Sequence, residues 1–262
     1  MNSVFSIGIC DNSGISWIGT GFFVVRKNND MTKMMPFLVT NKHVVVGNYP
    51  LVIRMRNRIT GSLDNFSIPS LKKDEITYFI HENTNVDIAV IPLNGEFIEK
   101  SSYDFFAFDI DNDALDSDQL REFDVDEGSL IYILGYPMGL VNMSSSTPIC
   151  RLGCIARMDK DQIESTNNIL VDIQNFPGNS GSAIIYRPEA LSIEGTKNLM
   201  NSVLIGIVHS YIPYRETLIN SQTGEIAEIR SENSGLAYAH PVEYIRHIID
   251  DFFKKNPNIF DM

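Results

Sequence analysis

A serine at position 180 stands between two glycines in the stretch FPGNSGSAI, residues 176–184. Glycine permits a sharp turn, and the apolar residues after the turn indicate a buried strand. A serine on such a turn can act as a nucleophile when a base removes its proton and backbone N–H groups face the substrate. The alternative is a tight turn and nothing more, so the partners of Ser180 must be sought elsewhere in the sequence.

Five histidines are candidates for the base. His43 follows the apolar run in FLVTNKHVVVG, so we expect it at the end of a buried strand, from which a fixed imidazole can project. His209 ends the apolar run VLIGIVH and is placed to line a cleft. Each histidine, taken alone, is more often structural than catalytic. The other three are His81, His240 and His247.

Two aspartates are candidates for the carboxylate that would orient the base. Asp87 opens NVDIAVIPL, and a charge at the start of a buried strand is costly unless a partner such as an imidazole faces it. Asp172, within ILVDI, is the rival on the same argument. Gly178 and Ser180 bracket one residue, so their N–H groups can converge on a single oxygen atom if the turn is sharp.

The elements that must position these side chains are short β-strands. Helical periodicity is scarce before residue 240, whereas short β-rich runs recur between turn signals. Twelve such runs predict an all-β fold, either paired barrels or a large sandwich. One amphipathic helix is expected over 241–255, starting at Pro241. The expected strands are residues 4–10, 16–25, 36–40, 51–55, 76–80, 87–93, 130–137, 149–158, 169–173, 182–186, 203–210 and 236–241.

Composition indicates a soluble globular protein, with 44% hydrophobic and 21% charged residues. Three cysteines argue against a disulfide framework and fit a reducing compartment. The amino-terminal sequence shows no signal-peptide pattern, and no run of about 18 apolar residues occurs. We therefore expect a cytoplasmic protein with no membrane partner.

The net charge of −12 is concentrated in one segment. Residues 103–128 hold ten acidic residues and one arginine, which leaves −3 for the rest of the chain. Nothing resembles a basic face for nucleic acid, so no nucleic-acid partner is expected. The acidic segment is predicted to be a solvated linker, residues 101–128, between an N-terminal β-barrel (1–100) and a C-terminal barrel with its helix (129–262).

Two weak metal patterns occur, and neither predicts a metal site. The C-x-x-x-C pattern at 150–154 has no second ligand pair nearby, so free thiols are expected. Aspartates at 109, 111 and 113 have the spacing of a calcium loop. However, Ala114 replaces the required glycine and Leu120 the required glutamate.

In chain order, these pieces resemble the trypsin-like (chymotrypsin-fold) serine peptidases, closest to the bacterial intracellular and HtrA-type members. GTGFFVV resembles the family's Gly-Ser-Gly-Phe strand, and LVTNKHVV its Thr-x-x-His motif. HENTNVDIAVIPL resembles the Asp-hydrophobic-Ala strand, and VDIQNFPGNSGSAI the Gly-Asn-Ser-Gly turn. EGSLIYILGYPMGL resembles the start of the second barrel, and LIGIVHSYI with GLAYAHPVEYI the pocket strands and closing helix. The order His, Asp, Ser is the one used by this fold.

The resemblance implies two six-stranded antiparallel β-barrels with a C-terminal α-helix. It implies peptide-bond hydrolysis through an acyl-enzyme intermediate, with a protein or peptide as substrate and no cofactor. His43 would be the base, Asp87 its orienting carboxylate and Ser180 the nucleophile. The N–H groups of Gly178 and Ser180 would form the oxyanion hole.

Four positions match the family's substrate-binding region. Gln174 stands where members that cleave after Arg or Lys carry an acid, so cleavage after basic residues is not expected. Tyr211 stands where a small residue leaves the specificity pocket open, which implies a preference for small or medium apolar side chains. His209 and Ser210 are expected along the cleft wall.

Two questions stay open at the level of the sequence. Asn179 replaces the aspartate that secreted zymogens use, so activation by N-terminal cleavage is not expected, and control should come from a loop or a regulatory protein partner. The polar segment 212–235 is either a gate over the site or a two-stranded surface hairpin that turns at 223–225. The alternative function is a catalytically silent peptide-binding or scaffold protein with the same fold.

Overall fold

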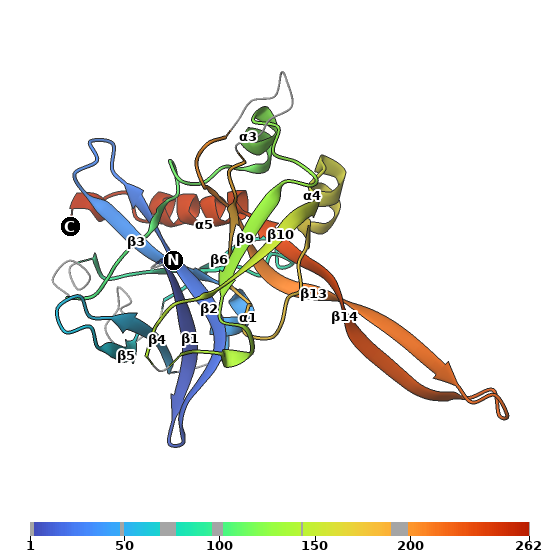
Figure 1. The fold of residues 1–262 in the computed structure, drawn as a ribbon. Coiled ribbons are helices and arrows are strands. Elements are labelled where there is room, and N and C mark those ends of the chain that lie inside the picture. The colour runs from blue at the N-terminus through green and yellow to red at the C-terminus, as the bar shows by residue number, and fades with distance from the viewer. Residues whose placement is uncertain are drawn as a thin grey trace.

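The computed structural model describes residues 3–47, 50–68, 77–95, 102–142, 144–189 and 199–261. Two antiparallel β-structures carry most of this part of the chain, and a long C-terminal helix packs against them (Figure 1). The helices are α1 (Lys42–Val45), α3 (Ser117–Glu122), α4 (Lys160–Thr166) and α5 (Val242–Lys255), with short 3₁₀ turns η1 (Pro137–Gly139) and η2 (Ile259–Asp261).

The N-terminal sheet contains eight strands in the order β5-β4-β1-β2-β3-β7-β6, with β8 parallel to β2. Strands β1 and β2 form a long hairpin, and the register of β2 against β3 pairs Phe22 with Val39. The strands are β1 (Val4–Asp11), β2 (Gly14–Lys27), β3 (Met34–Thr40), β4 (Leu51–Arg56), β5 (Leu63–Ser67), β6 (Phe79–Ile80), β7 (Ala89–Pro92) and β8 (Phe108–Asp109).

The C-terminal sheet closes into a six-stranded barrel in the order β10-β11-β14-β13-β12-β9. The barrel encloses apolar side chains, among them Ile131, Val171 and Ile205, each no more than 1% exposed. Its strands are β9 (Leu130–Gly135), β10 (Ile149–Arg157), β11 (Ile169–Asp172), β12 (Ala183–Tyr186), β13 (Leu204–Ile219) and β14 (Ile226–Pro241).

The expectation of two closed six-stranded barrels is therefore met only in the C-terminal half. In the described residues the N-terminal sheet has eight strands and is open, because β5 pairs only with β4 and β6 only with β7. Residues 69–76, which join these two edge strands, lie outside the described residues. The mostly-β class and the C-terminal helix are confirmed.

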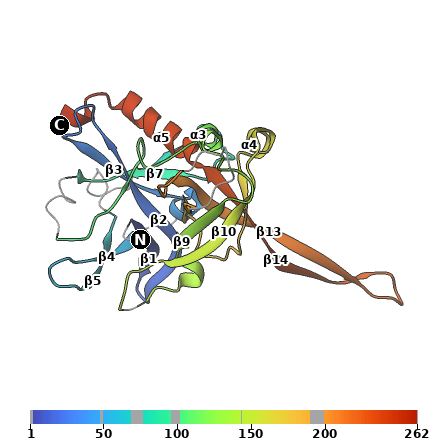
Figure 2. The ribbon, with the colours of Figure 1, turned by 45° about the horizontal axis from the view of Figure 1, so that its top comes forward.

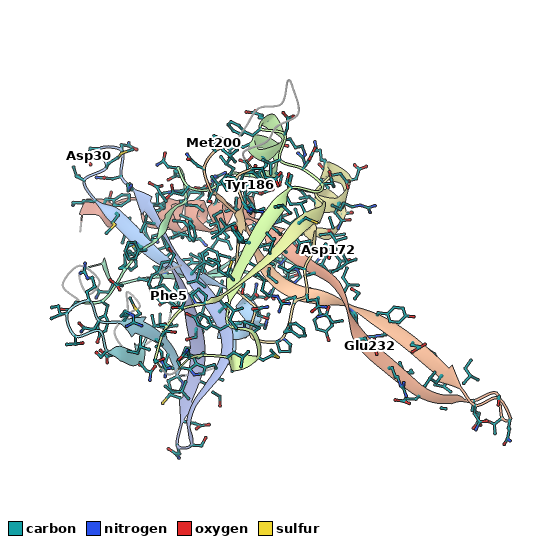
Figure 3. The ribbon with its side chains drawn as sticks, in the orientation of Figure 1. Phe5, Asp30, Asp172, Tyr186, Met200 and Glu232 are labelled. Atoms are coloured by element: carbon teal, nitrogen blue, oxygen red, sulfur yellow. The ribbon has the colours of Figure 1, made fainter. Side chains whose placement is uncertain are left out.

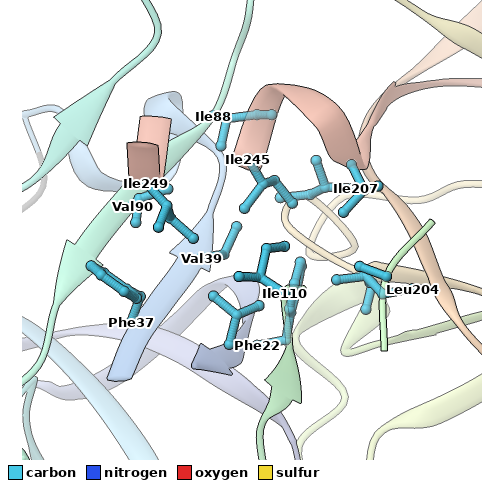
Figure 4. Close-up of a cluster of buried hydrophobic side chains, with 14 of the residues drawn as sticks. Phe22, Phe37, Val39, Ile88, Val90, Ile110, Leu204, Ile207, Ile245 and Ile249 are labelled. Carbon is cyan, nitrogen blue, oxygen red and sulfur yellow. The ribbon is translucent and has the colours of Figure 1, made fainter. Parts of the chain in front are cut away.

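The largest core cluster joins the two sheets and helix α5. Phe22 and Phe37 come from the N-terminal sheet, Leu204 and Ile207 from the barrel, and Ile245 from α5 (Figure 4). The apolar stripe expected on the helix is buried as expected. It consists of Ile245, Ile248, Ile249 and Phe252, each no more than 2% exposed.

The acidic segment does not behave as a solvated linker. Ile110, Leu120 and Val125 are no more than 1% exposed, because apolar residues alternate with the acids and enter the cores. Asp116 caps α3 in a capping box and also accepts a hydrogen bond from Arg246 of α5. Asp109 pairs with a lysine of β2, and no metal-binding cluster occurs among the described residues.

Strands β13 and β14 continue past the barrel as a two-stranded arm, defined here as residues 212–235 (Figures 1 and 2). The arm turns at 220–225, where Asn220 N–H donates to Glu225 C=O and Gly224 N–H donates to Asn220 C=O. Figure 3 shows its side chains, including Glu232, standing away from the body of the molecule. The hairpin alternative for this segment is thus confirmed.

No helix in the described part of the chain is long and apolar enough to cross a membrane. The three cysteines are free, as expected; two are exposed and the third is half-buried.

Candidate active site

His43 and Asp87 are in direct contact. His43 lies in α1, the helical turn that follows β3, and Asp87 lies two residues before β7, the neighbour of β3 in the sheet. The His43 backbone N–H donates to Asp87 Oδ1 over 3.0 Å, and its Nδ1 lies 2.5 Å from Asp87 Oδ2. A carboxylate only accepts hydrogen bonds, so Nδ1 carries the proton and Nε2 is the unprotonated ring nitrogen.

The Asp87 carboxylate is held in its ionised form. Burial raises the pKa of Asp87, but the side-chain and backbone hydrogen bonds from His43 outweigh burial and leave the pKa below its ordinary value. An ionised Asp87 fixes the His43 tautomer and would stabilise an imidazolium during proton transfer.

His240 holds the Asp87 backbone from the barrel side. Asp87 N–H donates to His240 Nε2 over 2.9 Å, while Asn41 Nδ2–H donates to Asp87 C=O over 2.7 Å. Because Nε2 accepts, His240 Nδ1 carries the proton and donates to the Asn167 carbonyl over 2.8 Å. Burial lowers the pKa of His240, so the ring stays neutral and keeps this acceptor at neutral pH.

His209 stacks on His240, with ring centroids 4.2 Å apart and planes inclined by 9°. Asn168 Nδ2–H donates to Thr166 C=O, which turns Asn168 Oδ1 toward His209 Nε2 at 2.7 Å. Burial, followed by the neighbouring His240, lowers the pKa of His209 to about 3. His209 is therefore a neutral ring that supports His240.

Thr20 of β2 ties the turn of Ser180 to the N-terminal sheet. Its N–H donates to the Ser180 carbonyl and its Oγ1–H to the Gly178 carbonyl, each over 2.8 Å. The same Oγ1 accepts the Tyr136 N–H over 3.0 Å. The turn belongs to the barrel, so Thr20 sets its position relative to the sheet that carries His43.

Two backbone N–H groups of the turn have no acceptor among the described residues. Asn179 N–H donates to Phe176 C=O over 3.0 Å, and Ser182 N–H donates to Asn179 C=O over 2.9 Å. Among the hydrogen bonds between described residues, none uses the N–H of Gly178 or of Ser180 as donor. These two groups can therefore donate to a developing oxyanion.

The conformation at Gly178 requires a glycine. Its φ is +93°, and a Cβ atom there would lie 2.5 Å from the Tyr136 carbonyl oxygen and 3.0 Å from the Met138 nitrogen. The preceding carbonyl, of Pro177, accepts the Met138 N–H over 2.5 Å. Because a trans peptide places C=O and N–H on opposite sides, the Gly178 N–H points away from Met138.

Gly19 allows α1 to approach the Ser180 turn. A Cβ atom at Gly19 would lie 2.9 Å from the Val44 side chain and 3.4 Å from the Ser180 carbonyl oxygen. Val44 is the neighbour of His43 in α1. A side chain at position 19 would thus push the helix of His43 away from the turn of Ser180.

The remaining expected site residues lie on two elements. Gln174 is exposed in the segment after β11, and the rival carboxylate Asp172 is exposed at the end of that strand. His209, Ser210 and Tyr211 follow one another on β13, and Tyr211 is 41% exposed. Asp172 is therefore not the buried acid that the sequence argument required.

Sequence reasoning missed Thr20, Asn41 and the contact of His240 with Asp87. Thr20 lies in the quoted stretch GTGFFVV, between two glycines that allow other parts of the chain to approach closely. These flanking glycines were the sequence signal that could have identified Thr20. His240 follows an apolar run, as His43 does, but no local pattern indicates that it faces Asp87. Asn41 is a buried amide directly before α1, where an N-cap role is the ordinary expectation.

The family described as a trypsin-like peptidase domain matches residues 19–189. Among solved structures, the chain is similar to an HtrA-type protease AlgW with decapeptide, at 17% identity and a TM-score of 0.49, covering 95% of this chain and 65% of that one. A variant of AlgW with decapeptide is 15% identical, with a TM-score of 0.50. The match covers 97% of this chain and 64% of the AlgW chain. The apo MamO protease domain from Magnetospirillum magneticum is 15% identical, with a TM-score of 0.45. The match covers 94% of this chain and 95% of that domain.

The chain spans less than two-thirds of the AlgW chains, and the similarity to AlgW at a TM-score of 0.50 shows a shared fold. No curated protein matches this sequence. The family match covers more than half of the chain, with the His43–Asp87 contact inside its bounds. The protein therefore belongs to the trypsin-like peptidase domain family.

Proposed function

We propose that the protein is a serine endopeptidase that hydrolyses peptide bonds through His43, Asp87 and Ser180. The observation that carries the proposal is the contact of His43 Nδ1 with Asp87 Oδ2 at 2.5 Å, on the sheet from which Thr20 holds the Ser180 turn. This contact places the His43 proton on Nδ1, so Nε2 is the nitrogen that would accept the Ser180 proton.

In the proposed reaction, His43 Nε2 takes the Ser180 proton as Oγ attacks the peptide carbonyl. The developing oxyanion accepts hydrogen bonds from the N–H groups of Gly178 and Ser180, which have no other acceptor in the described residues. The protonated His43 then gives its proton to the leaving amine, and an acyl-enzyme forms on Ser180. Water, activated by His43, releases the acid and restores the serine.

The proposed substrate preference follows from β13 and the segment after β11. Gln174 carries no charge to bind a basic side chain, and Tyr211 projects from the strand expected to form the pocket wall. We therefore assign small or medium apolar residues, such as alanine or valine, as the side chain before the cleaved bond. The AlgW structures were solved with a decapeptide, which supports a peptide as the ligand class here.

The proposal is tested by hydrolysis of an unfolded protein and of a peptide library. The wild type should cleave after small apolar residues, and Ser180→Ala and His43→Ala should each lose a factor of about 10⁴ or more in kcat/KM. Asp172→Asn is the matched control, an exposed aspartate outside the triad, and should keep full activity. Equal residual cleavage by wild type and Ser180→Ala would contradict the proposal.

Regulation by a protein partner is part of the same proposal. In that case the isolated chain hydrolyses peptides slowly, and the rate rises when the partner is added. Fast hydrolysis by the isolated chain would contradict partner control while leaving the triad assignment intact. A chain that binds peptides but never cleaves them would instead be the silent peptide-binding protein.

A further inference from the structure

The edge of β13 that holds the Ser180 turn continues outward along the arm. Val208 N–H donates to Ser182 C=O, and Gly181 N–H donates to Val208 C=O, each over 3.0 Å. Before this point β13 pairs with β12, up to Ile207. Beyond it, among the described strands, only β14 pairs with β13, on the opposite edge. An unpaired strand edge therefore begins at the nucleophile turn.

The backbone groups on this edge can be assigned residue by residue. The Ile212 carbonyl accepts from Ser234 Oγ on β14 over 2.6 Å, so Ile212 faces β14. Between Tyr211 and Pro213 the register of β13 against β14 shifts. From Pro213 outward, successive residues point their backbone groups to alternate sides, so Pro213 faces away from β14. Proline suits that place because its missing N–H costs no bond to β14. The register runs without a break from Pro213 to Leu218, which extends the outward set to Arg215 and Thr217.

The arm lacks the packing that normally supports two strands. Its residues are almost all exposed, and three isoleucines are 60–63% exposed (Ile219, Ile226 and Ile229). An isolated two-stranded hairpin is marginally stable in water. A third strand would give hydrogen-bond partners to the backbone groups on the open edge and would cover apolar side chains. The free edge is therefore suited to binding an extended chain.

One face of the arm is acidic. Glu216 on β13 lies directly opposite Arg230 on β14, so the two side chains share a face. Glu228 and Glu232 lie two residues to either side of Arg230 on β14, so they share this face too. Three glutamates and one arginine give this face a net charge of −2. A strand added to β13 would lie within about 10 Å of these charges, which is roughly the screening length at physiological salt.

We propose that the outward edge of β13 in the arm, from Pro213 to Thr217, binds the substrate segment N-terminal to the cleaved bond as an added antiparallel strand. This inference rests on the proposed function. An antiparallel strand on β13 runs toward Ser180, so the residues along the arm precede the cleaved bond. The substrate is thus an extended polypeptide with about five residues on the arm and basic side chains at alternate positions.

Binding is measured first, because it does not require catalysis. Fluorescence anisotropy of the full-length Ser180→Ala protein is recorded with three peptides ending in the same alanine-containing cleavage site. One has ten residues before the site with alternate lysines, one has glutamates in their place, and one has three residues. The long lysine peptide should bind about tenfold tighter than the other two peptides. A tenfold gain in affinity corresponds to the net free energy of about one to two hydrogen bonds. Equal binding of all three would overturn the proposal.

Two arm variants in the Ser180→Ala protein locate the binding surface. Replacing residues 214–232 by Asn-Gly, a two-residue hairpin turn, should abolish the advantage of the long lysine peptide. Glu216→Lys should remove the preference for lysine over glutamate. Glu225→Lys, with the same charge change in the turn of the arm, should keep that preference. Loss of preference in both point variants, or in neither, would contradict the assigned edge.

The same arm replacement in the otherwise unaltered protein separates this inference from the proposed function. Labelling of Ser180 by a small fluorophosphonate should persist, while kcat/KM for the long lysine peptide falls to the value for the short peptide. Arm-dependent binding without any labelling would refute the proposed hydrolysis and leave the arm surface standing. A lower sedimenting mass after arm replacement, with long and short peptides unchanged, would identify the arm as a contact between copies and overturn the inference.

Discussion

Thr20 connects the two halves of the candidate active site through a single buried side chain. Its Oγ1–H donates to the Gly178 carbonyl, and the same atom accepts the Tyr136 N–H. Thr20→Val keeps the shape but leaves both partners buried without a hydrogen bond, so the free energy of unfolding should fall by about 1–3 kcal/mol. Urea denaturation measures this loss, and kcat should fall because the Ser180 turn loosens.

Thr20→Ser is the matched control for this prediction, because it restores the hydroxyl and removes only a methyl group. It should recover most of the stability and of kcat. If the valine variant were as stable and active as the serine variant, the hydroxyl would not be what fixes the turn.

The neutral histidines behind Asp87 predict a pH dependence of stability. Burial and the adjacent His240 lower the pKa of His209 to about 3, well below its unfolded value. A histidine with a depressed pKa stabilises the fold above about pH 6.5, and this contribution decreases as the pH falls toward the folded value. The free energy of unfolding should therefore drop below pH 6.5, by up to about 1.4 kcal/mol per pH unit for each such histidine.

This pH dependence is measured by urea denaturation at pH 7, 6, 5 and 4. His209→Asn removes the titrating ring and should flatten the decline relative to the wild type. Identical slopes for the two proteins would show that His209 is not held neutral by the fold.

At the residue scale, the sequence predicts contacts that lie within recognisable motifs. His43 and Asp87 each stand beside a strand of strong apolar pattern, and the structure brings them together. Thr20 and His240 act across the boundary between sheet and barrel, over 158 residues to Gly178 and 153 residues to Asp87. Such contacts depend on how the two β-structures pack, and no local pattern encodes that.

At the scale of elements, helix α5 should be a major source of stability. Phe252 is 1% exposed and packs edge-on against Phe37 and Phe79, with ring centroids 5.2 Å apart in both pairs. Phe252→Ala should lower the free energy of unfolding by about 3–5 kcal/mol, since it leaves a cavity between helix and sheet. Chemical denaturation monitored by circular dichroism gives the value.

The control on the same helix is Lys254→Ala, which truncates an exposed side chain and should change stability by no more than about 0.5 kcal/mol. Similar effects of the two variants would mean that α5 is not anchored through its apolar stripe.

Most elements could be predicted from alternation and turn signals, and most of their ends differ by a few residues. Strands β13 and β14 are the exceptions, because each continues into the arm beyond the expected 203–210 and 236–241. The strand expected at 4–10 spans Val4–Asp11, and the helix expected at 241–255 spans Val242–Lys255. Strand β5 was not expected because LDNFS lacks a clear apolar alternation, and β8 because it has two residues. The acidic segment was predicted as solvated because its charge dominates its composition, while the buried residues Ile110 and Leu120 are few.

At the scale of the molecule, the proposed triad depends on the docking of a sheet that is open in the described residues onto a closed barrel. The sheet supplies His43 and Asp87, and the barrel supplies Ser180 with its two unused N–H groups. The mostly-β class followed from the sequence. The open edge of the sheet did not, because the closure of a sheet depends on pairing between distant strands. The hairpin over residues 212–235 was one of two alternatives, and the structure selects it.

The most direct test of the whole account is covalent labelling with a fluorophosphonate, read by intact mass. Labelling requires an activated serine and an accessible oxyanion site, so sheet and barrel must both be in place. We expect one adduct per wild-type chain, none on Ser180→Ala and far slower labelling of His43→Ala. A folded wild-type chain that stays unlabelled, or an adduct that persists on Ser180→Ala, would contradict the assignment of Ser180 as the nucleophile.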